Sequence, residues 1–167
     1  LEDLLKALLS ETGIAWFRLM YAYPAFLTDG LLEVMATESR VCKYLDMPIQ
    51  HASDRMLKAM HRLGDRAAIE RLVDRIRQRI PGVTFRTAFI VGFPGETEEA
   101  FNELKDYLQH AEFDRVAVFH YSDEEDTPAI GFEGKIEQDV MNERRNELLA
   151  VQETIAGAKG QAKVGMV

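Results

Sequence analysis

Apolar residues along the chain recur at two different spacings, which alternate from one end of the sequence to the other. Stripes at helical spacing predict helices over residues 1 to near 13, 29–37, 54–64, 66–80, 98–111 and about 136–156. Short runs rich in β-branched and aromatic residues predict strands over residues 16–23, 42–49, 83–91 and 116–121. The chain is therefore expected to alternate strands with helices.

Polar residues with short side chains stand just before four of the predicted helices. They are Thr28 or Asp29, Ser53, Asp65 and Thr97. An oxygen in each side chain can accept a hydrogen bond from a free backbone N–H of the first helical turn. These residues are the expected helix caps.

The order of the elements predicts a parallel sheet with helices outside it, an α/β fold, because a helix between two strands returns the chain in the same direction. Four strand–helix units are too few for an eight-stranded barrel, so a doubly wound sheet and an open part of a (β/α) barrel both remain. In either fold, ligands bind at the carboxyl ends of the strands. The candidate segments at that edge are 21–24, 48–53, 92–96 and 121–126.

The turn Gly92-Phe93-Pro94-Gly95 joins the third predicted strand to the helix that Thr97 caps. Its two glycines can adopt positive φ or let the backbone approach a flat ligand, and Pro94 stiffens the turn between them. The same residues are also typical of an ordinary strand-to-helix connection. The shape of the turn alone leaves both interpretations open.

Charge and cysteine content narrow the class of protein. The 28 acidic and 20 basic residues give a net charge of -8, which argues against a stand-alone nucleic-acid binder and favours a basic protein partner, although mild acidity also serves solubility alone. No apolar run is long enough to span a bilayer and no signal peptide is recognisable, so a cytoplasmic location is expected. Cys42 is the only cysteine, so this chain has no internal disulfide and no cysteine-only iron–sulfur site.

Three sequence motifs, in order and at matching spacing, resemble those of the radical S-adenosylmethionine (SAM) methylthiotransferases. They are YLDMPIQHAS at 44–53, FIVGFPGET at 89–97 and HYSDEEDTPA at 120–129. Within that family, these motifs are most similar to those of the enzymes that methylthiolate an aspartate of ribosomal protein uS12. The stretches 61–64 and 131–135 differ somewhat from the family's usual versions.

The resemblance implies a partial (β/α) barrel in which a [4Fe-4S] cluster cleaves SAM to start radical chemistry. The family carries its cluster on a C-x3-C-x2-C loop, which this chain lacks, so the ligand cysteines are expected elsewhere in the intact protein. Residues 1–135 would form the C-terminal portion of the barrel, and residues 136–167 an exit helix and linker towards a TRAM domain. The chain alone is expected to be inactive, because it lacks the cluster loop and the amino-terminal domain.

The resemblance also implies positions for the SAM-binding residues. Beside the adenine would lie Val91, Gly92, Phe93 and Pro94, flanked by Phe119 and Tyr121 from the last strand. Gln50 and Ser53 would lie near the ribose and methionine, and Arg18 and Tyr21 at the mouth near the methionine carboxylate. Ser53 could instead serve only as a helix cap, His51 could reach the substrate or close the strand end, and the aromatic residues could pack in the core. The spacing of His61, His110 and His120 does not indicate a metal site.

The acidic stretch 123–126 bears on the substrate. Four carboxylates would repel an RNA backbone and attract a basic ribosomal protein, although a solvated loop explains them equally well. Two other functions remain at this stage: a related enzyme that modifies adenosine in tRNA, and a non-catalytic α/β binding module.

Overall fold

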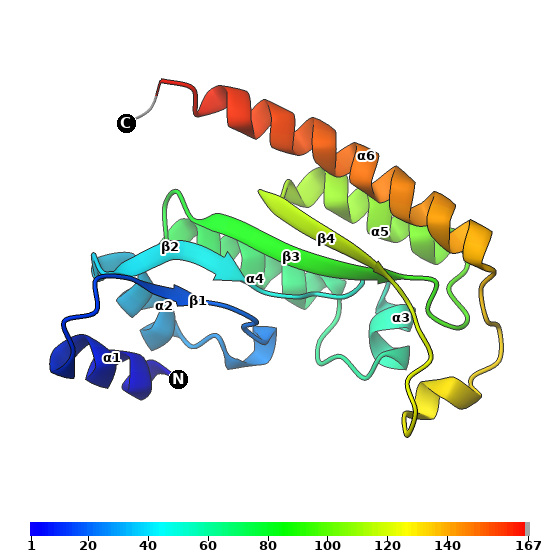
Figure 1. The fold of residues 1–167 in the computed structure, drawn as a ribbon, viewed down its shortest axis with the longest axis horizontal. Coiled ribbons are helices and arrows are strands. Elements are labelled where there is room, and N and C mark those ends of the chain that lie inside the picture. The colour runs from blue at the N-terminus through cyan, green and yellow to red at the C-terminus, as the bar shows by residue number, and fades with distance from the viewer. Residues whose placement is uncertain (166–167) are drawn as a thin grey trace.

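The computed structural model of the chain describes residues 1–165 and contains a sheet of four parallel strands in the order β1-β2-β3-β4 (Figure 1). The strands are β1 (Phe17–Leu19), β2 (Val41–Asp46), β3 (Thr84–Val91) and β4 (Arg115–His120). The α-helices are α1 (Glu2–Glu11), α2 (Asp29–Thr37), α3 (Asp54–Ala59), α4 (Arg66–Arg79), α5 (Glu98–Ala111) and α6 (Gln138–Ala162). Two 3-10 turns, η1 (Pro24–Phe26) and η2 (Pro128–Gly131), complete the elements.

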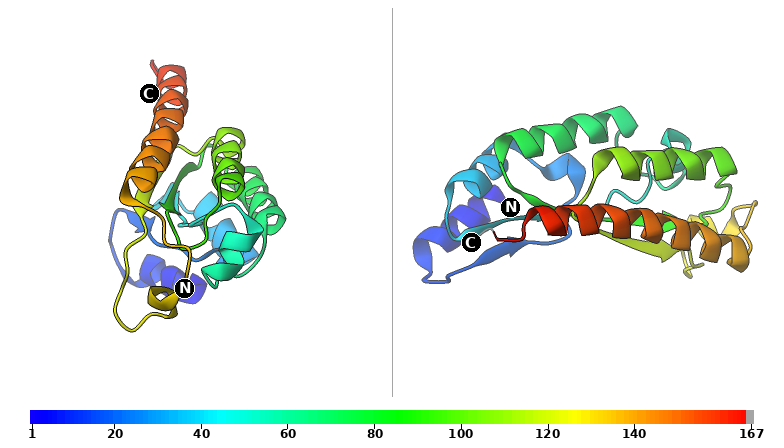
Figure 2. Two further views of the ribbon diagram at one scale, coloured as in Figure 1. Left: turned by 90° about the vertical axis from the view of Figure 1, so that its right-hand side faces the viewer. Right: turned by 90° about the horizontal axis from the view of Figure 1, so that it is seen from above.

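The helices that connect the strands cover one face of the sheet. Helices α2, α4 and α5 lie behind the strands in Figure 1, and α6 runs along the β4 edge, where it packs against β4 and α5 (Figures 1 and 2). The core lies between sheet and helices, and its largest fully buried aromatic residues are Phe85, Phe89, Phe101 and Phe113. Among residues 1–165, no helix lies on the opposite face of the sheet (Figure 1). The expected parallel α/β arrangement with outer helices is confirmed.

Three of the four expected helix caps are confirmed. The side-chain oxygens of Thr28, Asp65 and Thr97 accept hydrogen bonds from backbone N–H groups of the helices that follow. Ser53 occupies the cap position of α3, but its hydroxyl forms no cap hydrogen bond. Just before the helix, the imidazole Nδ1 of His51 accepts the N–H groups of Ala52 and Ser53, at 2.9 and 3.0 Å.

Several predicted boundaries were wrong. Strand β1 ends at Leu19 rather than near Tyr23, because Tyr21 adopts a left-handed backbone conformation with φ of 55°. Strand β2 ends at Asp46 rather than Ile49, and α3 ends at Ala59 before the turn at His61.

The predicted linker is also helical along most of its length. Helix α6 continues to Ala162 rather than ending near Ala156. The last two residues of the predicted linker, 166–167, lie outside the described residues. Within residues 1–165, none of the helices combines the length and the apolar composition needed to cross a membrane.

Candidate functional site

A cavity of about 430 Å³ opens at the carboxyl ends of β3 and β4. It is lined by Gln50, Met60, Arg62, Ile90, Phe93, His120, Tyr121, Ser122, Glu124, Thr127 and Ala129. The rings of Phe93 and Tyr121 meet edge to face with centroids 5.1 Å apart, so that one aromatic pair forms part of the wall. The segment after β2 and the turn after β3 therefore share one cavity, as expected from a parallel sheet.

Gln50 reaches this cavity because its backbone is held against β3. Its N–H donates to the carbonyl of Ala88 at 2.9 Å, and its carbonyl accepts the N–H of Ile90 at 2.8 Å. The residue has a φ of 77°, a conformation that a side chain of this kind adopts only when its surroundings impose it. The side chain of Gln50 is thereby placed in the wall of the cavity.

The turn at residues 92–95 contributes one side chain to the cavity, that of Phe93. Val91 and Pro94 are buried and do not line it. Gly92 has a φ of 80°, and a Cβ on it would collide with the side chain of Met141 on α6. Gly92 thus has the positive φ that was one of the two expectations for it, and it also lies in close contact with a helix.

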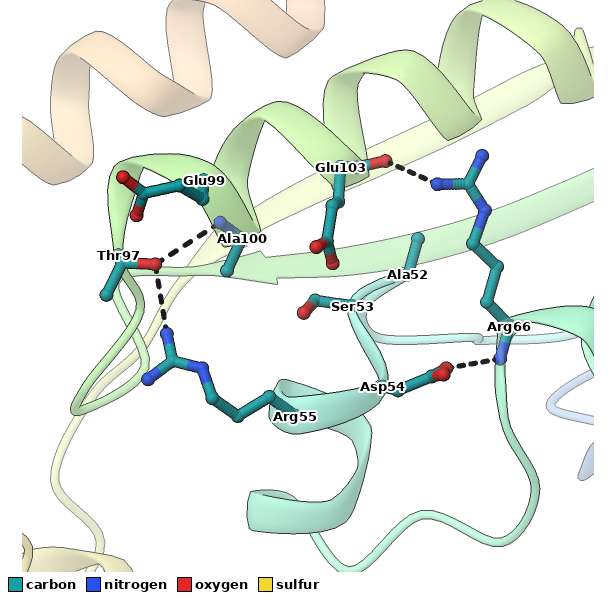
Figure 3. A pocket seen from close by; sticks show the side chains of 9 residues that line it. All are labelled: Ala52, Ser53, Asp54, Arg55, Arg66, Thr97, Glu99, Ala100 and Glu103. Atoms are coloured by element: carbon teal, nitrogen blue, oxygen red, sulfur yellow. Dashed lines mark hydrogen bonds between the residues drawn. The ribbon is translucent and has the colours of Figure 1, made fainter.

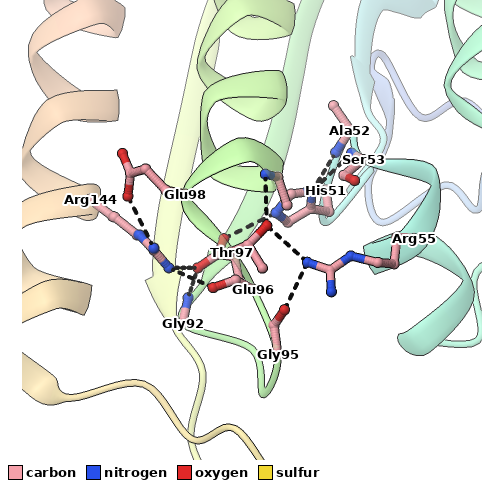
Figure 4. Close-up of polar contacts among 11 residues, drawn as sticks. His51, Ala52, Ser53, Arg55, Gly92, Gly95, Glu96, Thr97, Glu98 and Arg144 are labelled. Carbon is pink, nitrogen blue, oxygen red and sulfur yellow. Dashed lines mark hydrogen bonds and ion pairs between the residues drawn. The ribbon is translucent and has the colours of Figure 1, made fainter.

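A buried polar network lies directly behind the turn (Figure 4). The carboxylate of Glu96 contacts His51 Nε2 through Oε1 at 3.0 Å, and through Oε2 it accepts the Gly92 N–H at 2.6 Å and Arg144 Nη1 at 2.8 Å. The exposed fractions of His51, Glu96 and Arg144 are only 0%, 2% and 7%. Three segments distant in the sequence therefore meet at one carboxylate.

The hydrogen bonds assign the proton of His51. Its Nδ1 accepts two backbone N–H groups, so Nδ1 carries no hydrogen and the proton resides on Nε2, which donates to Glu96. The imidazole is neutral, and the carboxylate of Glu96 is balanced by the guanidinium of Arg144. His51 is buried and closes the end of the strand segment, which was the structural alternative among its two expected roles.

Sequence reasoning did not identify Glu96 and Arg144 as partners. Glu96 stood inside a candidate segment, and its signal was an acid at the end of a glycine-rich turn. Arg144 lies 48 residues later, on the predicted exit helix, and nothing in its local sequence separates it from Arg145. Only the packing of α6 against α5 and β4 brings its side chain to the turn.

Tyr121 is held at the cavity by polar contacts with the loop after β4. Its hydroxyl donates to Asp123 Oδ1 at 2.8 Å, and Lys135 pairs with the same carboxylate. Partial burial and then the bond to Asp123 raise the pKa of Tyr121. The hydrogen bond from Lys135 and then that from Tyr121 lower the pKa of Asp123, so the pair remains a phenol and a carboxylate near neutral pH.

Ser53 lies in a different cavity, of about 470 Å³, between α3, the start of α4 and α5 (Figure 3). Its neighbours there include Arg55, which donates to Thr97 Oγ1 at 3.0 Å, and Arg66, whose N–H donates to Asp54 at 2.7 Å. Ser53 is therefore not placed beside Gln50 in one pocket.

The other expected site residues lie outside the shared cavity. Arg18 stacks over the ring of Tyr44 at 4.6 Å, and Tyr21 is 74% exposed beside a third cavity formed by residues near α1 and η1. Phe119 is 54% exposed and pairs in register with Ile90, a cavity residue. Of the ten expected residues, the structure brings Gln50, Phe93 and Tyr121 together in one cavity.

Cysteine and histidine, the sulfur and nitrogen ligands of metals, are scarce in this chain, at one and four residues. Within residues 1–165, no group of three or more His, Cys, Asp or Glu side chains is arranged to hold a metal ion. Cys42 is half-buried in β2, and it is the only cysteine in the sequence. The residues present do not fit an iron–sulfur cluster.

The curated relatives are much longer than this chain. It is 46% identical over 167 residues to the ribosomal protein uS12 methylthiotransferase RimO of Pelotomaculum thermopropionicum, covering 100% of the chain and 38% of that protein. It is 47% identical over 156 residues to the protein of the same name from Geobacter sulfurreducens, covering 93% of the chain and 35% of that protein. The chain thus spans little more than a third of the length of these relatives.

Two solved structures share the fold. Coproporphyrinogen III oxidase (HemN) from Escherichia coli, a radical SAM enzyme, is similar with a TM-score of 0.60 and 22% identity over 95% of this chain and 36% of that one. The radical SAM methyltransferase TsrM from Kitasatospora setae, solved with cobalamin and a [4Fe-4S] cluster, has a TM-score of 0.57 and 18% identity over 71% of this chain and 24% of that one. The expected fold, part of a partial (β/α) barrel, is confirmed.

A family model agrees with both kinds of likeness. The model described as the radical SAM superfamily matches residues 1–108, which is well over half of the chain and includes β1, β2, β3 and the turn at residues 92–95. The chain belongs to the radical SAM superfamily.

Proposed function

We propose that this chain is the C-terminal part of the barrel of a radical SAM methylthiotransferase that modifies an aspartate of ribosomal protein uS12. The observation that carries the proposal is the identity of 46% to a uS12 methylthiotransferase over the whole chain. The cavity shared by Gln50 and Phe93 supports it, because both residues lie in motifs that suggested the family.

The shared cavity suits the nucleoside part of SAM. Its volume of about 430 Å³ falls in the range of small-molecule sites, and its wall combines aromatic rings with a few polar groups. Phe93 and Tyr121 would pack against the adenine, and the amide of Gln50 would hydrogen-bond to the ribose. Val91, Gly92 and Pro94 would act by shaping the turn that presents Phe93.

Ser53, Phe119, Arg18 and Tyr21 remain predicted SAM contacts. Phe119 lies beside Ile90 on the open face of the sheet, so a ligand that extends out of the cavity across that face would meet it. Arg18 lies within β1, and Tyr21 follows the carboxyl end of that strand. Together with the cluster, SAM would supply a radical that abstracts hydrogen from the substrate, and the cluster would be held by cysteines outside this chain.

The loop after β4 favours a basic protein substrate. Asp123 is paired with Lys135, whereas Glu124, Glu125 and Asp126 are exposed beside the cavity mouth. These carboxylates would attract a ribosomal protein rich in lysine and arginine and repel the phosphates of tRNA. Since the proposed substrate is a ribosomal protein, the enzyme would act in the cytoplasm.

The test uses the intact protein with a reconstituted cluster, SAM, a reductant, inorganic sulfide as the source of the sulfur atom, and either uS12 or tRNA. We expect release of 5′-deoxyadenosine and a mass increase of one methylthio group on the uS12 aspartate. Modification of tRNA instead would assign the chain to the tRNA enzymes. Absence of SAM cleavage with a loaded cluster would leave a binding module.

The contribution of the acidic loop is tested by charge reversal. Changing Glu124, Glu125 and Asp126 to lysine should raise the KM for uS12, with the effect shrinking at high salt because exposed charges are screened. The matched control reverses three exposed carboxylates on outer helices, Glu33, Asp74 and Glu153, which changes the net charge equally. An equal rise in KM in both variants would indicate a net-charge effect and no specific contact by the loop.

A further inference from the structure

The segment that leads into α6, together with the first two turns of α6 itself, contacts residues 92–96 at four points. Gly134 accepts the N–H of Gly95 at 2.8 Å, and the ring of Phe132 meets that of Phe93 with centroids 6.0 Å apart. Met141 occupies the space where Gly92 has no side chain, and Arg144 binds Glu96. The turn is therefore enclosed between the sheet and the start of α6.

The polar network also connects α6 to the other cavity-forming segment, residues 50–53. Glu96 fixes the turn through the Gly92 N–H and binds His51, and His51 in turn orients the N–H groups of Ala52 and Ser53. Figure 4 shows Glu96 between Arg144 on α6 and His51 at the end of the β2 segment. One guanidinium thus reaches both cavity-forming segments through one carboxylate.

The charges make Arg144 the member of the network that decides its stability. A carboxylate that is 2% exposed is costly to bury without a counter-charge, and His51 is neutral, so Arg144 supplies the compensating charge. Its Nη1 also donates to the backbone carbonyl of Glu96 at 3.2 Å, and its Nη2 pairs with Glu98 at 3.3 Å. Without the guanidinium, the Glu96 carboxylate would be driven towards water and away from Gly92 and His51.

We propose that Arg144 is a positioning residue of the SAM cavity, which acts through Glu96 to hold Phe93 and Gln50 in the arrangement that binds the nucleoside. This inference rests on the proposed function, because it assigns SAM to the cavity. Arg144 itself is behind the turn and does not line the cavity. Its effect is on the fraction of molecules in which the cavity is formed.

The prediction concerns affinity for SAM more than the chemical step. If only about a tenth of the molecules have the cavity formed, the apparent Kd for SAM rises about tenfold, while molecules that do bind react normally. Arg144→Met in the intact, cluster-loaded protein should therefore raise the Kd of SAM, measured by equilibrium dialysis without reductant. The KM for SAM in 5′-deoxyadenosine release should rise in step, with kcat retained. Arg144→Lys should fall between wild type and Arg144→Met.

Two further variants keep the test independent of folding defects. Glu96→Gln with Arg144→Met removes both buried charges, so that no uncompensated carboxylate remains, and its Kd should rise less than that of Arg144→Met alone, because the neutral amide can stay buried beside Gly92 and His51. Glu147→Gln is the matched control, because Glu147 pairs with Lys105 at 3.0 Å between α6 and α5, about one helical turn beyond Arg144, and is not part of the Glu96 network. It should leave the Kd of SAM unchanged.

The outcomes separate this inference from the proposed function. Unchanged Kd in folded Arg144 variants, or a lower kcat with unchanged KM, would overturn the positioning role while the function stands. A similar rise in Kd for Glu147→Gln would show that general docking of α6, and not Arg144, matters. A wild-type protein that binds no SAM would overturn the proposed function itself, and this inference with it.

Discussion

At Gly92, the turn after β3 packs against the side chain of Met141 on α6. This residue combines a positive φ of 80° with a position where a Cβ would meet the side chain of Met141. The sequence indicated two possible reasons for a glycine here, a positive φ or the approach of a flat ligand, and it did not indicate the contact with Met141. The structure gives it two physical requirements, a left-handed backbone and the absence of a side chain, which can be separated by experiment.

Gly92→Ala should destabilise the chain more than Gly82→Ala. Both glycines have positive φ, but nothing lies within 4 Å of a Cβ built on Gly82. Gly82→Ala should cost about 1–2 kcal/mol from the left-handed backbone alone. Gly92→Ala should cost about 1–3 kcal/mol more than Gly82→Ala, because the side chain of Met141 must move. Urea denaturation measures both, and equal losses would refute the contact with Met141.

The contact between Lys135 and Asp123 predicts a pH effect on the loop after β4. The pKa of Asp123 is lowered in the folded protein, mainly by the hydrogen bond from Lys135, so the contact stabilises the loop at neutral pH and is lost as pH falls through that lowered pKa. Lys135→Met should raise the pKa of Asp123 towards its ordinary value. A pH titration of the carboxyl carbon by NMR would show the rise. Lys58→Met, at an exposed lysine of α3, should leave the titration of Asp123 unchanged.

Among the elements, the long periodic helices were the easiest to predict and the short strands the hardest. Helices α4 and α5 have regular apolar stripes and confirmed caps, so their limits follow from local sequence. The end of β1 was missed because the left-handed Tyr21 is imposed by the surrounding chain, where Ala22 donates its N–H to the carbonyl of Asp46. No propensity scale contains such a contact.

The end of α6 was missed for the opposite reason. Glycine at positions 157 and 160 weakens the local preference for helix, which predicted a linker. The helix nevertheless continues to Ala162, after a docked part in which Gln152 Nε2 donates to the carbonyl of Phe113 at 3.0 Å. Once the earlier turns are anchored by packing, further turns add to an existing helix without a new nucleation step.

Replacing both glycines by alanine should therefore stabilise α6. No atom lies within 4 Å of a Cβ at Gly157 or Gly160, so alanine causes no clash at either position. Each change should add up to about 1 kcal/mol of helix stability, less towards the end of the helix. Circular dichroism at increasing temperature measures the gain. If the segment were a flexible linker, the two changes would leave the unfolding transition where it is.

For the whole molecule, the sequence predicted where the site lies but not what supports it. Parallel strands bring their carboxyl ends to one edge, so Gln50, Phe93 and Tyr121 could be placed together from topology alone. The network of His51, Glu96 and Arg144 could not, because its members are 45 and 48 residues apart and depend on how α6 crosses the fold.

The two faces of the sheet differ in a way that the predicted fold class did not specify. Parallel sheets are normally covered on both faces, whereas here α2, α4 and α5 cover one face (Figure 1). Phe119, 54% exposed, alternates along β4 with the buried Val118 and so points to the other face. The side chain of Phe119 is therefore accessible to a ligand or to another part of the intact protein. We proposed above that SAM extends across this face.

Substitutions on neighbouring strands should separate a packing role from a binding role. Phe89 on β3 is fully buried and lies 6.3 Å from the ring of Phe113, so Phe89→Ala should cost about 3–5 kcal/mol of unfolding free energy. Phe119→Ala, one strand away on the open face, should change it by no more than about 0.5 kcal/mol. In the intact protein, however, Phe119→Ala should weaken SAM binding, because the side chain faces the proposed ligand and not the core. A large loss of stability with normal SAM binding would assign Phe119 to packing, and the open face would then be covered by protein in the complete barrel.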